Sequence, residues 1–187
     1  MNGKVNIVFG FIYLAMTALL GPVLLVPQLG ANLKTMGDTA QVVDKVQEGL
    51  RNDFKGFKGA NSPNKVIGQA TVSIFNFTKN SKNLSLLAGG PHAHGNLEAL
   101  LNIAAGVVLL TLAIPANFKK LLSILFLTGA VFHSGMLYLG GVFGMMWAYN
   151  FTIIGVIALL AGLVFAGIAS IIGIKQPVSP AERGELK

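Results

Sequence analysis

Four long blocks of apolar residues dominate this chain of 187 residues. The blocks lie at about 5–25, 90–114, 121–140 and 151–174. Each is long enough for a helix that crosses a hydrocarbon core, which needs roughly 20 residues. Only 11% of the residues are charged, whereas a soluble domain carries about a quarter. The sequence therefore predicts an all-α integral membrane protein, a four-helix bundle, with 1–187 forming a single membrane domain.

Prolines and glycines mark the expected ends of the first two spans. Pro27 closes the first block, Gly89-Gly90-Pro91 opens the second, and Pro115 follows it. Proline is tolerated in the first turn of a helix and beyond its end, but it weakens a helix interior. These positions therefore predict helix boundaries.

Basic residues near the span ends set the expected orientation, because cytoplasmic loops carry an excess of Lys and Arg. If four helices alternate, one side of the membrane receives Lys4, Lys119, Lys120, Lys175, Arg183 and Lys187. We therefore expect both termini in the cytoplasm, in the inner membrane of a prokaryote. The net charge is +7, and we expect the basic residues to contact anionic lipid headgroups. We therefore expect no nucleic-acid partner.

With this orientation, the segment 29–85 is expected to form a long extracytoplasmic loop. Asp38 is a candidate N-cap for an amphipathic helix. Its apolar face consists of Val42, Val43, Val46, Leu50, Phe54 and Phe57. We expect this helix to lie on the membrane surface or to cover the bundle, and we expect Thr71–Phe77 to be irregular.

Several kinds of chemistry are excluded by composition and motif. The chain has no cysteine, which removes disulfides, Cys-ligated zinc, iron–sulfur clusters and covalent c-type haem attachment. It also has no phosphate-binding loop, dinucleotide fingerprint or hydrolase nucleophile elbow. Nucleotide-driven transport and hydrolysis are therefore not expected.

One polar stripe runs along the second span. His94, Glu98, Asn102 and Gly106 recur every four residues and so share one helix face. An ionisable residue inside a span costs about 2.5–3.5 kcal/mol on insertion, and for that reason it is a candidate for function. His92 lies about 200° around the helix from His94 and faces the loop or a second site.

All three histidines of the chain lie inside the expected spans or at their ends. His94 and His133 are expected at nearly the same depth, because the second and third spans run in opposite directions. Two facing imidazoles can supply both axial ligands of a haem iron. We expect them to bind haem b, with Gly106 leaving room for the macrocycle. Glu98 and Asn102 would fix a ligand tautomer, contact a propionate or relay a proton.

The segment Pro91–Asn96, continuing through Leu101–Ile103, resembles two kinds of membrane protein. It is similar to the His-Ala-His-x-Asn motif of small proteins akin to the haem-binding core of haem–copper oxidase subunit I. It also resembles styrene oxide isomerase, a four-span family in which Ala-His-(Ser/Gly) opens the second span. That second resemblance implies that His94 is the axial ligand of haem b, whose ferric iron acts as a Lewis acid on an epoxide.

The resemblance to the isomerase also implies catalytic roles for Asn102 and Tyr138. Asn102 lies farther from the histidine than the family's asparagine does, and Tyr138 matches the family's tyrosine only with a shift of one residue. His133 is a further departure, because a second histidine ligand would fill the iron position that an epoxide needs.

We therefore expect electron transfer, as a small subunit of a respiratory or quinone-linked complex. The expected partners are the lipid membrane, other membrane subunits or further copies of the chain, and a quinone or small apolar substrate. Three alternatives remain open. The first is a haem-dependent epoxide isomerase in which His133 points away from the iron. The second is a non-haem metal site made from His92, His94, Glu98 and His133. The third is a purely structural subunit.

Overall fold

The computed structural model describes residues 3–174, which are helical almost throughout and contain no strand. Four continuous helical rods are each long and apolar enough to cross a membrane: Lys4–Arg51, Pro63–Thr111, Ala116–Phe143 and Met146–Gly173. The prediction of an all-α protein with four helices long and apolar enough to cross a membrane is confirmed. The predicted cytoplasmic residues Lys175, Arg183 and Lys187 lie outside the described residues.

Each rod is built from shorter elements. The first rod contains α1 (Lys4–Leu20), η1 (Gly21–Leu25) and α2 (Val26–Arg51). The second contains α3 (Pro63–Leu87), η3 (Ala88–His94) and α4 (Gly95–Thr111), and it is preceded by the short turn η2 (Gly59–Asn61). The third contains α5 (Ala116–Ala130), η4 (Val131–Gly135) and α6 (Met136–Phe143). The fourth contains η5 (Met146–Phe151) and α7 (Thr152–Gly173).

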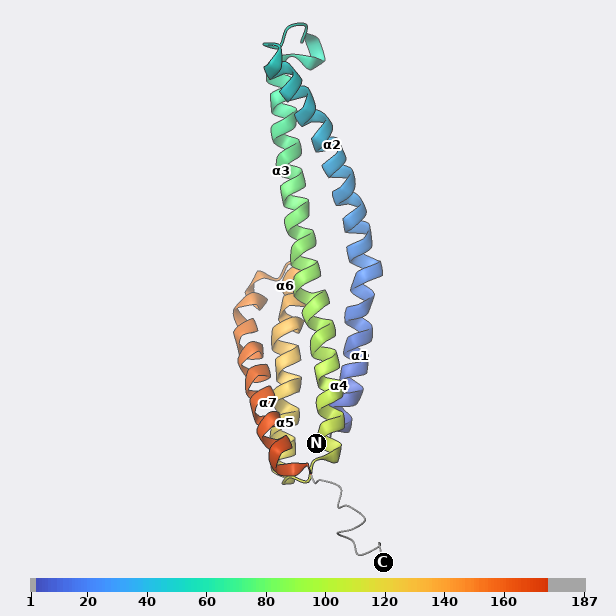
Figure 1. Cartoon of the computed structure of the whole chain (residues 1–187), viewed down its shortest axis with the longest axis vertical. Helices are drawn as coiled ribbons and strands as arrows, with labels where there is room; N and C mark the ends of the chain where they lie inside the picture. Colours follow the sequence, from blue (N-terminus) through green and yellow to red (C-terminus); the bar gives the residue numbers. More distant parts are fainter. Residues whose placement is uncertain (1–2, 175–187) are drawn as a thin grey trace, which may run out of the picture.

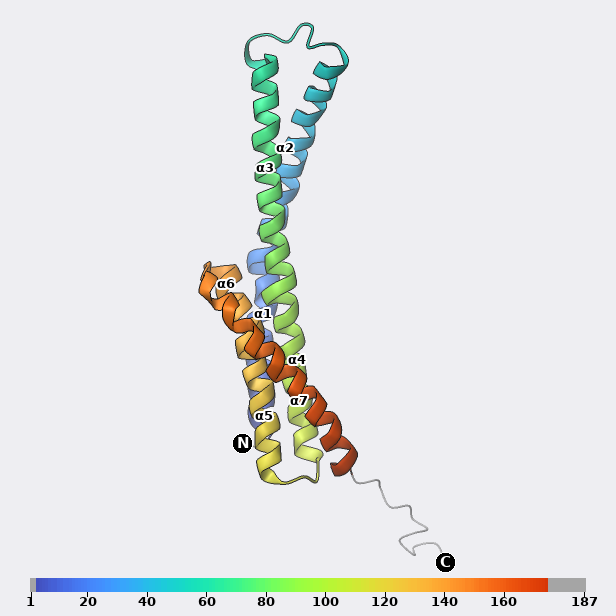
Figure 2. The same cartoon turned by 90° about the vertical axis from the view of Figure 1, so that its left-hand side faces the viewer.

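The segment 29–85 is not a loop that covers the bundle. Figure 1 shows α2 and α3 as a long antiparallel pair that continues the first two spans and projects beyond the rest of the molecule. Figure 2 shows the two helices diverging toward the connection between them. The helix start predicted at Asp38 and the irregular stretch predicted at Thr71–Phe77 are both wrong, because both lie inside continuous helices.

The α2–α3 pair is held by a seam whose residues recur at alternating intervals of three and four, the spacing of a coiled coil. The Asn32 amide donates to Ser81 Oγ at 3.1 Å, and the Thr39 hydroxyl donates to the Ser73 carbonyl at 3.2 Å. The seam residues, all at least partly buried, are Asn32, Thr35, Thr39, Val42, Val46 and Gly49 on α2, and Val66, Ala70, Ser73, Phe77, Asn80, Leu84 and Leu87 on α3. Asparagine, threonine and serine side chains alternate with the apolar residues of this seam. The apolar residues alone therefore do not show its period.

The predicted boundaries at Pro27 and at Gly89-Gly90-Pro91 are also wrong, because the helix continues through both. The turn before Pro27, η1, and the turn that contains Gly89-Gly90-Pro91, η3, are both π-helical, and a third π-helical turn is η4. A proline removes one backbone hydrogen bond, and membrane helices tolerate it where the local turn widens and neighbouring groups satisfy the freed carbonyl. The boundary predicted at Pro115 does exist: α4 stops at Thr111, and Pro115 directly precedes α5.

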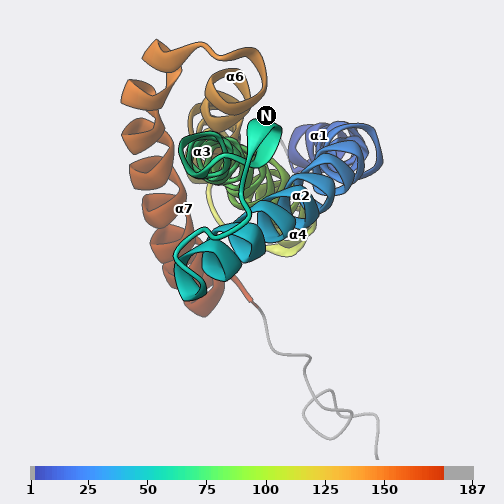
Figure 3. The ribbon, with the colours of Figure 1, turned by 90° about the horizontal axis from the view of Figure 1, so that it is seen from above.

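The membrane-spanning part packs as a bundle in which α1 lies along α4, while α5 lies between α4 and α7. Figure 3, seen along the bundle, shows α1 and α7 on opposite sides of the α3–α4 rod. Lys4, Lys119 and Lys120 lie at one end, where α1 and α5 begin, and the α2–α3 pair projects from the other. We call the end with the α2–α3 pair the outer end.

Glycines allow α1 to approach α4 closely. A Cβ atom at Gly10 would lie 2.7 Å from the Ala99 carbonyl oxygen, and one at Gly106 would lie 2.5 Å from the Gly3 carbonyl oxygen. Gly106 was predicted to leave room for a macrocycle, but the backbone and side chain of α1 occupy that space.

We expect Gly10→Ala to lower the stability of the bundle by about 1–3 kcal/mol, because the added methyl overpacks the α1–α4 contact. The matched control is Gly167→Ala, since a Cβ there meets nothing within 4 Å. Thermal unfolding of both variants in detergent provides the measurement. Equal stability of the two variants would contradict the close α1–α4 approach.

Candidate functional site

Glu98 is the hub of a buried polar cluster in the outer half of the bundle. It lies on α4 and is only 2% exposed. Its Oε1 is 2.5 Å from Nδ1 of His133, in η4. Its Oε2 accepts the backbone N–H of Ser134 at 3.2 Å and also the Ser134 hydroxyl. The one acid inside the spans is thus fully engaged with two consecutive residues of the third rod.

This arrangement assigns the hydrogens of the cluster. The Ser134 N–H and O–H both donate to Oε2 of Glu98, as donors do to the oxygen of an ionised carboxylate. We infer that the hydrogen between Oε1 and His133 belongs to Nδ1 of the ring, which leaves Nε2 with a free lone pair. A carboxylate that holds the far nitrogen of an imidazole is the usual support of a metal-ligating histidine.

The cluster continues to α1 through Tyr13. The Tyr13 hydroxyl lies 2.8 Å from Ser134 Oγ. Because the Ser134 hydrogen goes to Glu98, Tyr13 donates to Ser134. The fourth rod supports the same turn from behind: a Cβ at Gly155 would overlap the His133 backbone nitrogen, so α7 packs directly on η4.

His94 completes the group. The His94 and His133 ring centres are 4.8 Å apart with their planes at 63°. Potential ligand atoms of His94, Glu98 and His133 all lie within 4.8 Å of one another. Glu98 is buried, His133 is partly buried and His94 is exposed. The structure thus brings together the two histidines that were expected at matched depth.

The remaining predicted residues lie elsewhere. His92 donates from Nδ1 to the Thr17 carbonyl at 3.1 Å and takes no part in the group. Tyr138 packs against Phe143, with ring centres 5.5 Å apart.

Asn102, one turn below Glu98, belongs to a second buried polar layer. It accepts from the Asn6 amide at 3.0 Å and donates to the Phe126 carbonyl at 3.1 Å. The Ser123 hydroxyl donates to the Asn6 side-chain oxygen at 2.5 Å. The side-chain oxygen and nitrogen of Asn102 bind α1 and α5. Asn102 therefore holds α1, α4 and α5 together in this structure.

Sequence reasoning did not connect Ser134, Tyr13, Asn6 or Ser123 with the polar stripe of the second span. Each is a single polar residue inside an apolar span, and nothing in its spacing links it to Glu98 or Asn102. The only available signal was that buried polar groups need partners. That rule demands a partner without naming it.

A cavity of about 450 Å³ lies beside the two histidines. It is lined by residues of α3, η3, η4, α6 and η5. Its lining includes His94, His133, Gly90, Leu137 and Tyr149. This volume falls in the range of small-molecule sites, about 300–1,000 Å³, so the cavity has room for a small molecule beside the histidines.

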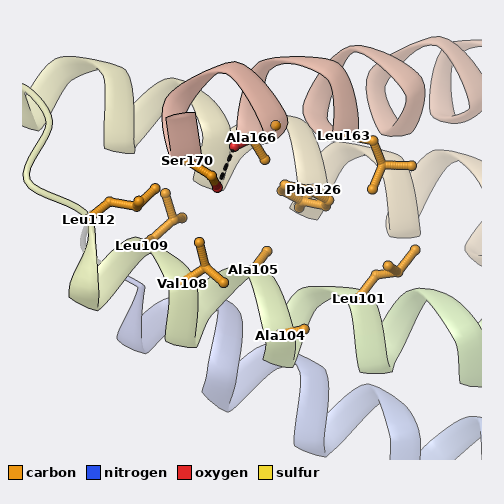
Figure 4. Close-up of a pocket in the computed structure, with 11 residues that line it drawn as sticks. Leu101, Ala104, Ala105, Val108, Leu109, Leu112, Phe126, Leu163, Ala166 and Ser170 are labelled. Carbon is orange, nitrogen blue, oxygen red and sulfur yellow. Dashed lines mark hydrogen bonds between the residues drawn. The ribbon is translucent and has the colours of Figure 1, made fainter. Parts of the chain in front are cut away.

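A second cavity, of about 280 Å³, lies nearer the other end of the bundle between α4, α5 and α7 (Figure 4). Its lining is almost wholly apolar, and the Ser170 hydroxyl there donates to the Ala166 carbonyl of its own helix at 2.8 Å. No titratable side chain lines it. It offers space without reactive groups.

The spacing of the two imidazole rings limits the kind of metal centre that His94 and His133 could hold together. A metal–imidazole bond is about 2.0–2.1 Å, so two imidazoles on opposite faces of one metal have ring centres more than about 6 Å apart. The observed 4.8 Å is too short for a haem between the rings as they lie. It fits a metal ion bound from one side, or a haem iron held by one histidine. A haem with two histidine ligands requires the exposed His94 ring to turn outward.

Comparisons with protein families, curated proteins and solved structures give no match to this chain. Its function therefore has to be argued from the site.

We expect Ser134→Ala to destabilise the protein by about 1–2 kcal/mol, because Glu98 loses a donor and Tyr13 loses its acceptor. This magnitude follows from about 0.6–1.7 kcal/mol per hydrogen bond between membrane helices. Ser170→Ala is the control, since the Ser170 hydroxyl bonds only its own helix. Unfolding in detergent measures both variants, and a Ser134→Ala variant as stable as the control would contradict the assigned network.

Proposed function

We propose that this protein binds a transition-metal centre through His94 and His133 and uses it for electron transfer in the membrane. The observation that carries the proposal is the group of His94, Glu98 and His133, with ligand atoms within 4.8 Å of one another. The proposal includes the expected orientation, with the α2–α3 pair outside the cytoplasm.

The chemistry of the donors supports a redox metal. Neutral imidazole is a good ligand for iron and copper, both of which change oxidation state. Glu98 holds Nδ1 of His133, which directs Nε2 to the metal and makes the ring more basic. Glu98 itself is saturated by donors, so its role in this proposal is to position His133.

Haem b is the form of the centre that the resemblance of Pro91–Asn96 implies. His94 or His133 would hold its iron, and the iron would supply one-electron chemistry when bound. The cavity beside both histidines offers a place for a quinone or another apolar redox partner to approach from the lipid.

A second candidate function is haem-dependent epoxide isomerisation. The observation that favours it is the 4.8 Å spacing of the two rings, which suits iron held by one histidine with its other face open to the cavity. An open iron position could polarise an epoxide oxygen without net redox change.

The test begins with the full chain, expressed with an ample supply of haem and purified in detergent. Metal content and the absorption spectra of the oxidised and reduced protein are recorded for the wild type and for His94→Ala, His133→Ala and His92→Ala. We expect both of the first two variants to lose at least about 10-fold of a bound metal ion, and at least one of them to lose a bound haem to the same extent. The His92→Ala control should retain it, because His92 lies outside the group.

A wild type that binds neither haem nor a transition metal would refute the proposal, as would equal loss in all three variants. A bound haem whose reduced and oxidised spectra are indifferent to His133→Ala would refute two-histidine ligation and favour the isomerase.

Glu98→Gln gives a finer prediction. The amide is nearly the same size, but it is neutral and offers one acceptor atom in place of two, so His133 loses its charged hydrogen-bond partner. We expect metal or haem affinity to fall about 10- to 100-fold, the usual effect of losing such a supporting group. Titration of the metal-depleted protein measures this, and an unchanged affinity would contradict the positioning role.

A further inference from the structure

The α2–α3 pair stands outside the membrane-spanning bundle. Gln28 of α2 and Lys82 of α3 line a depression together with Gly144 and Tyr149 of the outer connection between α6 and α7. That connection also carries Trp147, and Trp and Tyr mark the level of the membrane–water interface. From Gln28 to Arg51, α2 therefore extends roughly 35 Å beyond this level, at 1.5 Å per residue.

One face of this projecting helix is mostly apolar and mostly exposed, with the polar Gln47 between Val43 and Leu50. Leu29, Leu33, Met36 and Leu50 are 47%, 58%, 53% and 64% exposed. Together with Ala40 and Val43 they recur at intervals of four, three, four, three and seven residues. We call Leu29, Leu33, Met36, Ala40, Val43 and Leu50 the α2 stripe.

The α2 stripe is distinct from the seam that joins α2 to α3. The seam contains Asn32, Thr39 and Val46, which lie about 60–100° around the helix from the neighbouring stripe residues. The hydrogen bonds of the pair run through seam residues, as in Asn32 to Ser81. The stripe is therefore a second helical face, and α3 does not cover it.

The spacing of the α2 stripe indicates the kind of partner that it suits. Apolar residues that alternate at intervals of three and four form the contact face of a coiled coil, which takes another helix as its partner. Gly30 and Gly37 each follow a stripe residue, and a Cβ at either would meet nothing within 4 Å. Small residues beside a contact face let two helix backbones come close.

We propose that α2 of a second copy of this chain packs along the α2 stripe, parallel and in register, and joins the copies outside the bundle. The membrane itself selects this partner, because every copy is inserted in the same direction. The stripes of neighbouring copies therefore run parallel, start at the same height and share one period. The proposal does not depend on the metal site.

The chain has no cysteine, so single cysteines report contacts without background. Leu33→Cys and Met36→Cys are introduced into the full chain, and membranes are treated with a mild oxidant. The controls are Ala31→Cys and Asp38→Cys, which are exposed positions at similar height off the stripe. We expect covalent dimers at both stripe positions, with at least about 5-fold less at the controls.

Equal cross-linking at stripe and control positions would indicate random collision and overturn the proposal. The absence of covalent dimers in Leu33→Cys or in Met36→Cys would also overturn the proposal. Cross-linking only to a different protein would overturn it as well. A second measurement uses the double variant Leu33→Gln/Met36→Gln, whose mass in detergent should fall from that of an oligomer to that of one chain. A wild type that is already a single chain under these conditions would overturn the proposal as well.

Discussion

A carboxyl group buried among membrane-spanning helices needs several hydrogen-bond donors, and the site is arranged around this requirement at Glu98. The donors come from His133 and Ser134 in η4, and Tyr13 of α1 extends the network by one bond. Meeting the requirement ties three separate rods together at one level. It also fixes the direction of the His133 ring, and with it any chemistry at this site.

Local backbone geometry brings these groups into place. His94 ends one π-helical turn, η3, and His133 lies within another, η4. A π-helical turn adds a residue to the helix, shifts the register of the side chains that follow, and is often found at functional sites. Below it, the layer of Asn6, Asn102 and Ser123 keeps α1, α4 and α5 in fixed relation.

The sequence was sufficient to predict the number of spans, because each apolar block is long enough to cross a membrane without help from tertiary contacts. It also paired His94 with His133, since depth follows from counting residues along antiparallel helices. It failed at Pro91 and at Asp38, where local signals for helix ends were overridden by a widened turn and by a continuous, partly polar seam. It did not pair Ser134 with Glu98, because a hydrogen-bond partner on another helix leaves no mark in the spacing of residues.

The central claim is that Glu98 holds the hydrogen of His133 on Nδ1 and leaves Nε2 free for a ligand. Nitrogen NMR of metal-free protein carrying ¹⁵N-labelled histidine tests this directly, with the His133 signals assigned by their absence in His133→Asn. The account predicts a protonated Nδ1 and an unprotonated Nε2 in the wild type, and a mixture of the two tautomers in Glu98→Gln. A wild-type His133 that carries its hydrogen on Nε2 alone would contradict it.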